Sequence, residues 1–274
     1  MTTTLQPALP STVRIGISRG RVEILEFLRD RTALIFTFSF PAILLLLFGV
    51  IFSGDFEDTG VTASQVFSAS MIAYGIVSTA FITMGVGLAV DREDGTLKRL
   101  RGTPVTATAY FIGKFLFVAV ISLLEVAVLL AIGVLVFDMP LPGDAGLWFT
   151  FGWVFLLSVT ACTLTGIAAS SLVRNARTAG AILNVPVVAL QFLSGVFIHP
   201  ITRLPDWMIT LASVFPVKWI AQGYRSVFLP DSMAAWEAGG AWEHGRIALV
   251  LGAWCVIGLV LCLATFRWTN RRDA

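Results

Sequence analysis

Six long apolar runs dominate the chain, and the polar residues gather in the segments between and around them. The runs cover residues 33–52, 66–90, 107–137, 147–173, 179–197 and 247–266. Each is long enough for a helix to cross ~30 Å of hydrocarbon, which takes about 20 residues. The pattern predicts an all-α integral membrane protein with six transmembrane helices.

The composition agrees with this prediction. The chain has 274 residues, of which 57% are hydrophobic and 13% are charged, and its mean hydropathy is +0.85. Soluble domains average about 25% charged residues. We divide the chain into a cytoplasmic N-terminal segment over 1–32, one transmembrane domain over 33–266 and a cytoplasmic tail over 267–274. The cysteines all lie in apolar runs, so we expect small apolar side chains there and no disulfide framework.

The basic residues lie mostly on one side of the predicted membrane domain. Of the 19 Lys and Arg residues, only these fall on the other side: Arg203, Lys218, Arg225 and Arg246. The connections on that other side carry acids: Asp55, Glu57, Asp58, Asp138 and Asp144. Cytoplasmic segments of membrane proteins carry an excess of Lys and Arg. We therefore expect both termini and the polar segment 91–104 to lie in the cytoplasm.

Apolar residues recur at helical spacing before the first apolar run. They are Ile17, Ile24, Leu25 and Leu28, and they are surrounded by Arg14, Arg19, Arg21, Arg29 and Arg31. This pattern is typical of a helix that lies in the membrane interface on anionic lipid. The alternative is a basic extension that only sets the topology of the first span.

The longest strongly charged stretch lies between the second and third runs, over residues 91–104. Leu97 and Leu100 are three residues apart and share one face of a helix. Basic residues cover the other faces: Lys98, Arg99 and Arg101. Acidic residues crowd the N-terminal end, where a helix dipole favours anions: Asp91, Glu93 and Asp94. The stretch predicts a short amphipathic helix that ends at Gly102 and Pro104; a solvated loop would explain its charges but not its leucines.

This stretch, DREDGTLKRLRGTPV from Asp91 to Val105, resembles the cytoplasmic signature of ABC-2-type transporter permeases, which are exporter subunits related to drug and lipid efflux systems. The resemblance implies a coupling helix that rests in a groove of an ATP-binding subunit. The matching positions are Asp91, Arg92, Glu93, Gly95, Thr96, Leu97, Arg99, Leu100, Thr103 and Pro104. The basic N-terminal helix likewise resembles the interface helix of this family, through Arg21, Ile24, Leu25, Leu28 and Arg29.

The segment before the last run is divided by Pro200, Pro205, Pro216 and Pro230 into two apolar pieces, 206–215 and 217–228. Each piece is about half the length that a span requires. Two helices that dip into the outer leaflet and return fit this pattern, provided that protein or a water-filled cavity shields their ends. They resemble the re-entrant extracellular helices of ABC-2 exporters. The alternative is an interfacial hairpin anchored by Trp207, Trp219 and Tyr224.

Polar residues within the runs are few. Glu125 lies near the middle of the third run, where an ionised carboxylate costs ~2.5–3.5 kcal/mol. It belongs either to a substrate path or gate, or to a structural contact with residues such as Ser122, Thr160 or Thr163. Asn184 and Gln191 are seven residues apart on either side of Pro186, and they either line a route or join helices. The candidate path or gate residues are Glu125, Asn184, Gln191, Phe192, Trp207, Phe215, Trp219 and Tyr224.

The sequence contains no Gly-x-x-x-x-Gly-Lys-Ser/Thr motif for binding nucleotide phosphates and no spacing typical of a metal or nucleophilic site. We expect no enzymatic activity and no cofactor in this chain, and we expect ATP and Mg²⁺ to be bound by a partner. The resemblance implies two copies of an ATP-binding cassette ATPase and a second copy of this chain or a related permease. The basic clusters favour membrane lipids and protein partners over nucleic acid.

The expected function is export of a hydrophobic or amphiphilic drug, antibiotic or lipid across the bacterial plasma membrane. One alternative is an ABC-2 permease for a polysaccharide or glycolipid, which aromatic girdles along the path would favour. A second alternative is an ATP-independent secondary transporter, which predicts ionisable residues on several spans, whereas Glu125 stands nearly alone. An intramembrane enzyme would show clustered catalytic residues at membrane depth, and the runs contain none.

Overall fold

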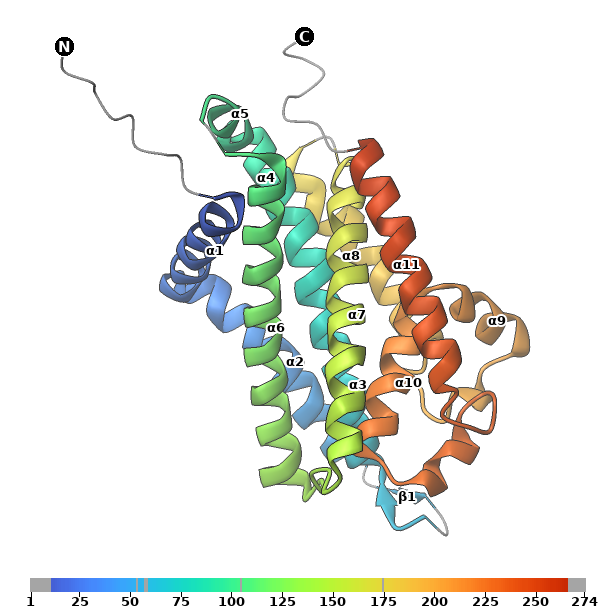
Figure 1. Ribbon diagram of the computed structural model, residues 1–274. Helices are drawn as coiled ribbons and strands as arrows, with labels where there is room; N and C mark the ends of the chain where they lie inside the picture. Colours follow the sequence, from blue (N-terminus) through green and yellow to red (C-terminus); the bar gives the residue numbers. More distant parts are fainter. Residues whose placement is uncertain (1–10, 53, 57–58, 104, 174, 266–274) are drawn as a thin grey trace, which may run out of the picture.

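The computed structural model is a bundle of long helices (Figure 1), and it describes residues 11–52, 54–56, 59–103, 105–173 and 175–265. Six stretches of this described part are long and apolar enough to cross a membrane. They are α2 (Arg31–Ile51), the α3 to α4 stretch (Ala63–Glu93), α6 (Ala107–Phe137), α7 (Ala145–Ser170), α8 (Ala176–Leu193) and α11 (His244–Thr265). The predicted all-α fold with six spans is confirmed.

Two spans differ in detail from the prediction. The fifth span ends at Leu193 instead of continuing to 197, because Gly195 has a φ of 72°, a left-handed conformation that a helix cannot continue through. In the second span, α3 (Ala63–Val77) and α4 (Met84–Glu93) are joined by a π-helical turn, η1 (Ser78–Thr83). Positions 1–10 of the predicted N-terminal segment, the acids Glu57 and Asp58, position 266 and the predicted tail 267–274 lie outside the described residues.

The shorter elements lie at the two ends of the bundle. The helix α1 (Thr12–Arg29) and the short helix α5 (Thr96–Arg101) are at the end where α11 finishes (Figure 1). A hairpin of β1 (Asp55–Phe56) and β2 (Val61–Thr62) is at the opposite end. Between α8 and α11 the chain forms η2 (Ile201–Arg203), α9 (Asp206–Val214), α10 (Pro216–Phe228) and η3 (Asp231–Trp236).

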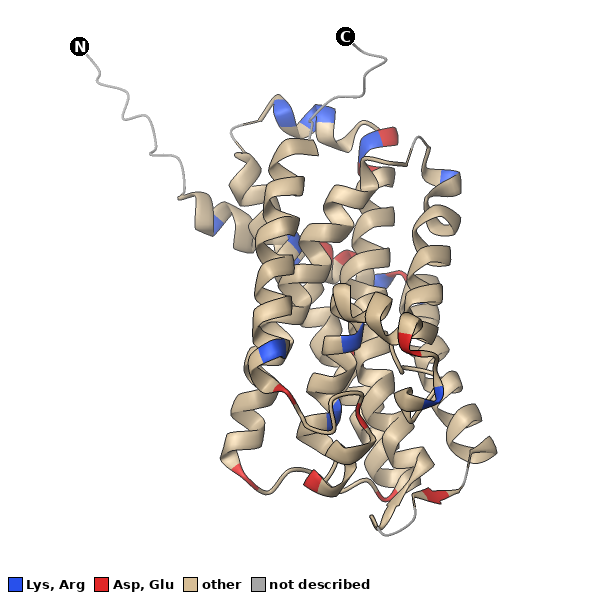
Figure 2. Ribbon diagram, turned by 90° about the vertical axis from the view of Figure 1, so that its right-hand side faces the viewer, with Lys and Arg blue, Asp and Glu red and all other residues tan. Residues whose placement is uncertain are grey.

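Charge is divided between the same two ends. Figure 2 shows Lys and Arg gathered around α5 and Asp and Glu gathered around the opposite end of the bundle. This division is the one that the sequence predicted from the connections between the runs.

Side-chain caps at the starts of several helices explain where the chain turns. Asp30 ends α1 and accepts hydrogen bonds at its Oδ1 from the backbone N–H groups of Thr32 and Ala33, both at 3.0 Å, so α2 starts in a new direction. Thr62 and Gln65 form a capping box at the start of α3, and Asn175 caps α8. These caps satisfy backbone N–H groups that a helix start leaves without partners.

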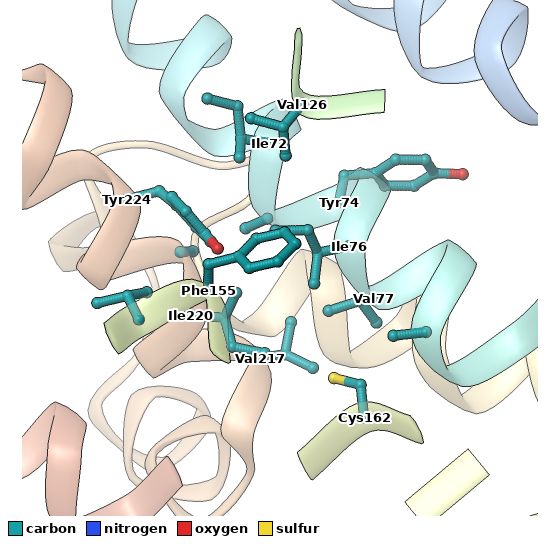
Figure 3. Close-up of a cluster of buried hydrophobic side chains, with 14 of the residues drawn as sticks. Ile72, Tyr74, Ile76, Val77, Val126, Phe155, Cys162, Val217, Ile220 and Tyr224 are labelled. Carbon is teal, nitrogen blue, oxygen red and sulfur yellow. The ribbon is translucent and has the colours of Figure 1, made fainter. Parts of the chain in front are cut away.

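The core is built around α10, every residue of which is buried. In Figure 3 Ile72 and Ile76 of α3, Phe155 of α7 and Ile220 and Tyr224 of α10 point toward one another. The helix α10 packs against α3, α7 and α11. The helix α10 has about half the spanning length and lies inside the bundle rather than on its surface, and its predicted re-entry into the membrane stays a prediction. Its partner α9 is more exposed.

The crossing of α1 and α6 is unusually close, because glycines meet there. Gly16 and Gly20 of α1 face Gly113 of α6, and a Cβ atom added at Gly20 would lie 2.9 Å from the Gly113 carbonyl oxygen. Small residues spaced four apart let helix backbones approach in this way in membranes. The sequence analysis identified the basic and apolar residues of α1 but not these glycines.

We expect Gly20→Ala to destabilise the protein by ~1–3 kcal/mol, because the new methyl group overpacks a contact between backbones. The matched control is Gly252→Ala in α11, where an added Cβ would have no neighbour within 4 Å. Thermal unfolding in detergent micelles measures both. Equal melting temperatures for the two variants would contradict the close crossing.

Candidate coupling surface and membrane-buried polar sites

The stretch that resembles a coupling segment folds as the short helix α5 at the basic end of the bundle. Gly95 separates it from α4 with a φ of 78°, a left-handed conformation that glycine adopts without strain. Leu97 is 1% exposed and anchors α5 to the bundle, and Leu100 is half-buried against the same core. Arg99 and Arg101 are exposed. The predicted division of α5 into an apolar and a basic face is present.

Local hydrogen bonds hold the start and the end of α5. The Asp94 Oδ1 accepts from the Thr96 N–H at 2.9 Å, and this bond holds the pKa of the Asp94 carboxyl below its usual value. The Arg99 guanidinium donates to the Asp94 carbonyl at 3.3 Å. The Thr103 hydroxyl donates to the Leu100 carbonyl at 2.7 Å beyond the last turn. Pro104, the predicted end of this segment, lies outside the described residues.

Asp91, Arg92 and Glu93 do not form the first turn of α5, as the sequence analysis expected. They form the last turn of α4, because the left-handed Gly95 starts a new helix after them. The Arg92 guanidinium donates to the Ser170 carbonyl at 3.0 Å and to the Ser170 hydroxyl at 3.2 Å. The Glu93 carboxylate accepts from the Ala176 N–H. These contacts connect the end of α4 to the end of α7 and the start of α8.

Asp91 belongs to a charged cluster that joins α4, α6 and α1. Its Oδ2 accepts from the Tyr110 hydroxyl at 2.9 Å and lies 2.8 Å from the Lys114 Nζ. The same Lys114 Nζ is 3.2 Å from the Glu23 Oε2, and Glu23 also pairs with Arg19 at 3.3 Å. Burial raises the pKa of Glu23, although the two cations oppose the shift. In the sequence this cluster was indicated only by Lys114, a lysine inside the apolar run 107–137.

The predicted interface helix presents a mixed surface. Leu25 and Leu28 are exposed beside the exposed cations Arg21 and Arg29, whereas Ile24 is half-buried toward the bundle. A helix with apolar and basic residues open on its outer side is suited to the lipid headgroup region. Contact with lipid stays a prediction.

Glu125 is 1% exposed, and its partner is not one of the expected hydroxyls. The Thr79 hydroxyl of η1 donates to the Glu125 Oε2 at 2.6 Å. The expected partner Thr160 bonds to the Leu156 carbonyl of its own helix at 2.6 Å. Gly75 makes room for the carboxyl, since a Cβ there would lie 2.8 Å from the Glu125 carboxyl carbon. Glu125 therefore does not line an open surface of this chain.

The polar residues of α8 do not form one continuous lining. Asn184 and Pro186 are exposed, and so is Phe192, but Gln191 is 0% exposed. The side-chain amide of Gln191 has no hydrogen-bond partner within the described residues. The helix α8 is covered by α9 and α10 near its C-terminal end, so Asn184 and Gln191, which are seven residues apart, have different surroundings.

The outer aromatic residues are also divided. Trp207 of α9 is 63% exposed, and Phe215 stacks on Trp254 with ring centroids 5.9 Å apart. Trp219 and Tyr224 are buried, and the Trp219 indole N–H donates to the Ser213 carbonyl at 2.8 Å. Of the predicted outer path residues, Trp207 is thus the most open, whereas Trp219 and Tyr224 belong to the core in this structure.

An ion pair that the sequence analysis missed holds α10 in place. Arg225 and Glu237 have fully buried side chains and form a two-pronged pair, with N···O distances of 2.5 and 3.0 Å. Arg225 also donates to the Gly195 carbonyl at 3.1 Å and to the Ser70 hydroxyl at 3.3 Å. This one side chain connects α10 to α3, to the end of α8 and to the segment after η3.

A comparison with protein families identifies a match over most of the chain. The family described as "ABC-2 type transporter" matches residues 20–229. This range includes α5, the charged cluster apart from Arg19, η1 and the whole of α10.

Several named proteins are similar to this chain. The probable multidrug ABC transporter permease YbhR of Escherichia coli (strain K12) is 26% identical over 163 residues, which cover 60% of this chain and 43% of YbhR. The putative transport permease YvfS of Bacillus subtilis is 26% identical over 200 residues, covering 70% and 73%. The daunorubicin resistance ABC transporter permease protein DrrB1 of Streptomyces coeruleorubidus is 24% identical over 236 residues, covering 84% and 78%. The match thus spans less than half the length of YbhR.

Proposed function

Since the chain belongs to the ABC-2 type transporter family, it is a multi-pass transport permease, and we propose that it exports its cargo as the membrane subunit of an ATP-binding cassette transporter. A separate ATPase subunit binds and hydrolyses ATP and Mg²⁺. The membrane is the bacterial plasma membrane, with both chain termini, α1 and α5 on the cytoplasmic side, in accordance with the gathering of Lys and Arg there.

The observation that carries this proposal is the form of α5. It is anchored by the buried Leu97 and offers Arg99, Arg101 and Thr103 to a partner at the basic end of the bundle. A groove of about 500 Å³ runs along α1 and is lined by Arg14, Ser18 and Val22 among others, together with Val105, which follows α5 in the chain. A helix held at both ends and exposed along its basic face is suited to rest in a groove of a second protein.

Movement of α5 reaches the spans through the last turn of α4. Arg92 and Glu93 connect that turn to α7 and α8, and Asp91 connects it to α6 and α1. In the proposed mechanism ATP binding closes a pair of ATPase subunits, their grooves carry α5 with them, and the spans alternate between access to the two sides of the membrane.

The permease works as two copies, or with a related permease, and each copy binds one ATPase subunit. Three spans are mostly uncovered in the single chain, since only 17% of the apolar part of α2 and 22% of that of α8 and of α11 is buried, and α2 and α8 are the two that we assign to this arrangement. The polar Asn184 is exposed on α8 near the middle of the membrane domain. A polar side chain at that depth faces protein or a water-filled path rather than lipid.

The cargo is a hydrophobic or amphiphilic drug, antibiotic or lipid. The exposed faces of α2 and α8 carry Phe36, Phe40 and Phe192, and they offer apolar contact together with the amide of Asn184. The names of YbhR and DrrB1 state multidrug transport and daunorubicin resistance for those proteins. The wall of a path for such a cargo needs apolar surface with a few polar groups.

Affinity purification of the tagged chain from its own membranes tests the proposal. We expect an ATPase with a Gly-x-x-x-x-Gly-Lys-Ser/Thr motif in equal amount, and we expect everted vesicles with both proteins to take up daunorubicin when ATP is added. Vesicles whose ATPase carries a substituted motif lysine are the control. A well-folded permease that never brings an ATPase with it would contradict the partner, and ATP-independent uptake would favour a secondary transporter.

A further inference from the structure

The second span is a continuous helix over Ala63–Glu93 with a π-helical turn in its middle, and no proline accounts for this turn. The π-turn η1 joins α3 and α4 across Ser78–Thr83. A π-turn closes its hydrogen bonds over one residue more than an α-turn, and such turns occur frequently at functional sites in helices. Proline, the commonest cause of a break in a helix, is absent from the whole stretch Ala63–Glu93.

The two halves of this span pack in different parts of the molecule. The outer half, α3, packs mainly against α2, α6 and α10, whereas the inner half, α4, packs against α7 and α8. The inner half leads directly into α5. The π-turn therefore lies between a part of the span that is fixed in the core and a part that is connected to the proposed coupling surface.

The carboxyl group of Glu125 lies against this turn from α6. It accepts the Thr79 hydroxyl at 2.6 Å, and the bare backbone of Gly75 in the preceding turn makes space for it. Its other oxygen, Oε1, is buried without a partner among the described residues. A buried carboxyl group of this kind is costly. Its one hydrogen bond is to the second residue of the π-turn.

A glycine fixes the turn from the other side. Gly166 of α7 lies against the backbone of Phe81, and a Cβ at Gly166 would be 2.6 Å from the Phe81 carbonyl oxygen. One turn further, a Cβ added at Gly85 of α4 would lie 2.7 Å from the Leu183 side chain and 3.0 Å from the Gly166 carbonyl oxygen. The inner half of the span is thus seated closely on α7, while Glu125 holds the turn to α6.

We propose that η1 is the hinge on which α4 and α5 move relative to α3, and that Glu125 is the positioning residue that holds this hinge in its π form. Conversion of the π-turn to α-helix shifts everything after it by one residue, which is a rotation of about 100° and a rise of ~1.5 Å. Such a shift moves α5, the helix proposed to bind the ATPase subunit, without moving the core around α10. The inference rests on the proposed function only in assigning ATP as the source of the movement.

Hydrogen exchange of the chain alone in lipid nanodiscs tests the positioning role without any partner. We expect Thr79→Val and Glu125→Leu to speed amide exchange in residues 78–83 by about tenfold, since each removes the buried hydrogen bond, and to leave 66–76 unchanged. Thr79→Ser and Glu125→Gln keep a donor and an acceptor and are expected to behave like the parent. Ser122→Ala removes a buried hydroxyl one turn away on α6 and is the matched control.

Spin labels test the hinge in the assembled transporter. In a chain whose cysteines are replaced, one label is placed at Val90 of α4 and the other at Leu135 of α6, both of which are exposed. We expect ATP to shift the distance between them in the parent and Thr79→Ser, and we expect Thr79→Val to show the shifted population before ATP is added. A purely structural role of Glu125 would lower the melting temperature and leave this population unchanged.

The outcomes separate the hinge from the proposed function. Equal exchange at 78–83 in the parent and both disrupted variants overturns the positioning role of Glu125, and so does an increase spread evenly over the whole span. If Thr79→Val or Glu125→Leu does not fold, the exchange of Thr79→Ser or Glu125→Gln and the distance between the labels in the parent still decide whether the hinge exists. An ATP-driven distance change that is identical in the parent and Thr79→Val overturns the hinge. If no ATPase binds, the proposed function fails, and the exchange result decides the positioning role.

Discussion

Replacing Arg99 and Arg101 together by glutamate is expected to weaken binding of the ATPase subunit strongly. Both side chains are exposed on α5, so the groove that receives them must be complementary to positive charge. Two reversed charges against such a groove weaken binding by about a hundredfold, because like charges facing each other at an interface cost several kcal/mol. Co-purification of the ATPase from detergent and its affinity for the permease in nanodiscs measure the loss.

The choice of these two residues follows from the burial of the leucines beside them. Leu97 and Leu100 pack against the bundle, so changing either would unseat α5 and mix a folding defect with a docking defect. The matched control is Arg29→Glu with Arg31→Glu, which changes the charge by the same amount at an exposed turn between α1 and α2. If the control loses the ATPase to the same extent, net charge rather than α5 governs the association.

The layout of the fold could be predicted from the sequence because its causes are local. The length of an apolar run decides whether it can span, and the prolines that divide the segment before the last run stand at the starts of η2, α9, α10 and η3. Gly195 shows the limit of such reasoning. A single left-handed residue ends α8 four positions before its apolar run does, and an isolated glycine in a run does not reveal its φ.

The partners of the buried polar groups could not be predicted, because they come from residues far apart in the sequence. Glu125 accepts a hydrogen bond from Thr79, which is 46 positions away. The hydroxyl of the expected partner Thr160 instead donates to the Leu156 carbonyl of its own helix. Asp91 was expected at the start of α5, but it lies in the last turn of α4 and pairs with Lys114 of α6. Periodicity places a residue on a face of its own helix; it does not say which helix lies opposite.

The ion pair of Arg225 and Glu237 is expected to give the largest loss of stability in the molecule when it is broken. Arg225→Met leaves the Glu237 carboxylate buried without its cation, at a cost of ~3–5 kcal/mol. Two further hydrogen bonds, to Gly195 and Ser70, are lost at the same time. Unfolding of the purified chain in mixed micelles of a mild and a denaturing detergent measures the change in free energy.

A double variant separates the stranded charge from the lost anchor. Arg225→Met together with Glu237→Leu removes both charges, so most of the stability returns if the unpaired carboxylate causes the loss. Arg246→Met is the control, because its pair with Glu243 has a similar distance but an arginine side chain that is 72% exposed, so we expect at most ~1 kcal/mol. A double variant as unstable as Arg225→Met would instead assign the loss to the bonds with Ser70 and Gly195. Arg225 would then act as the residue that ties α10 to α3 and α8, and α10 would lose its fixed position in either variant.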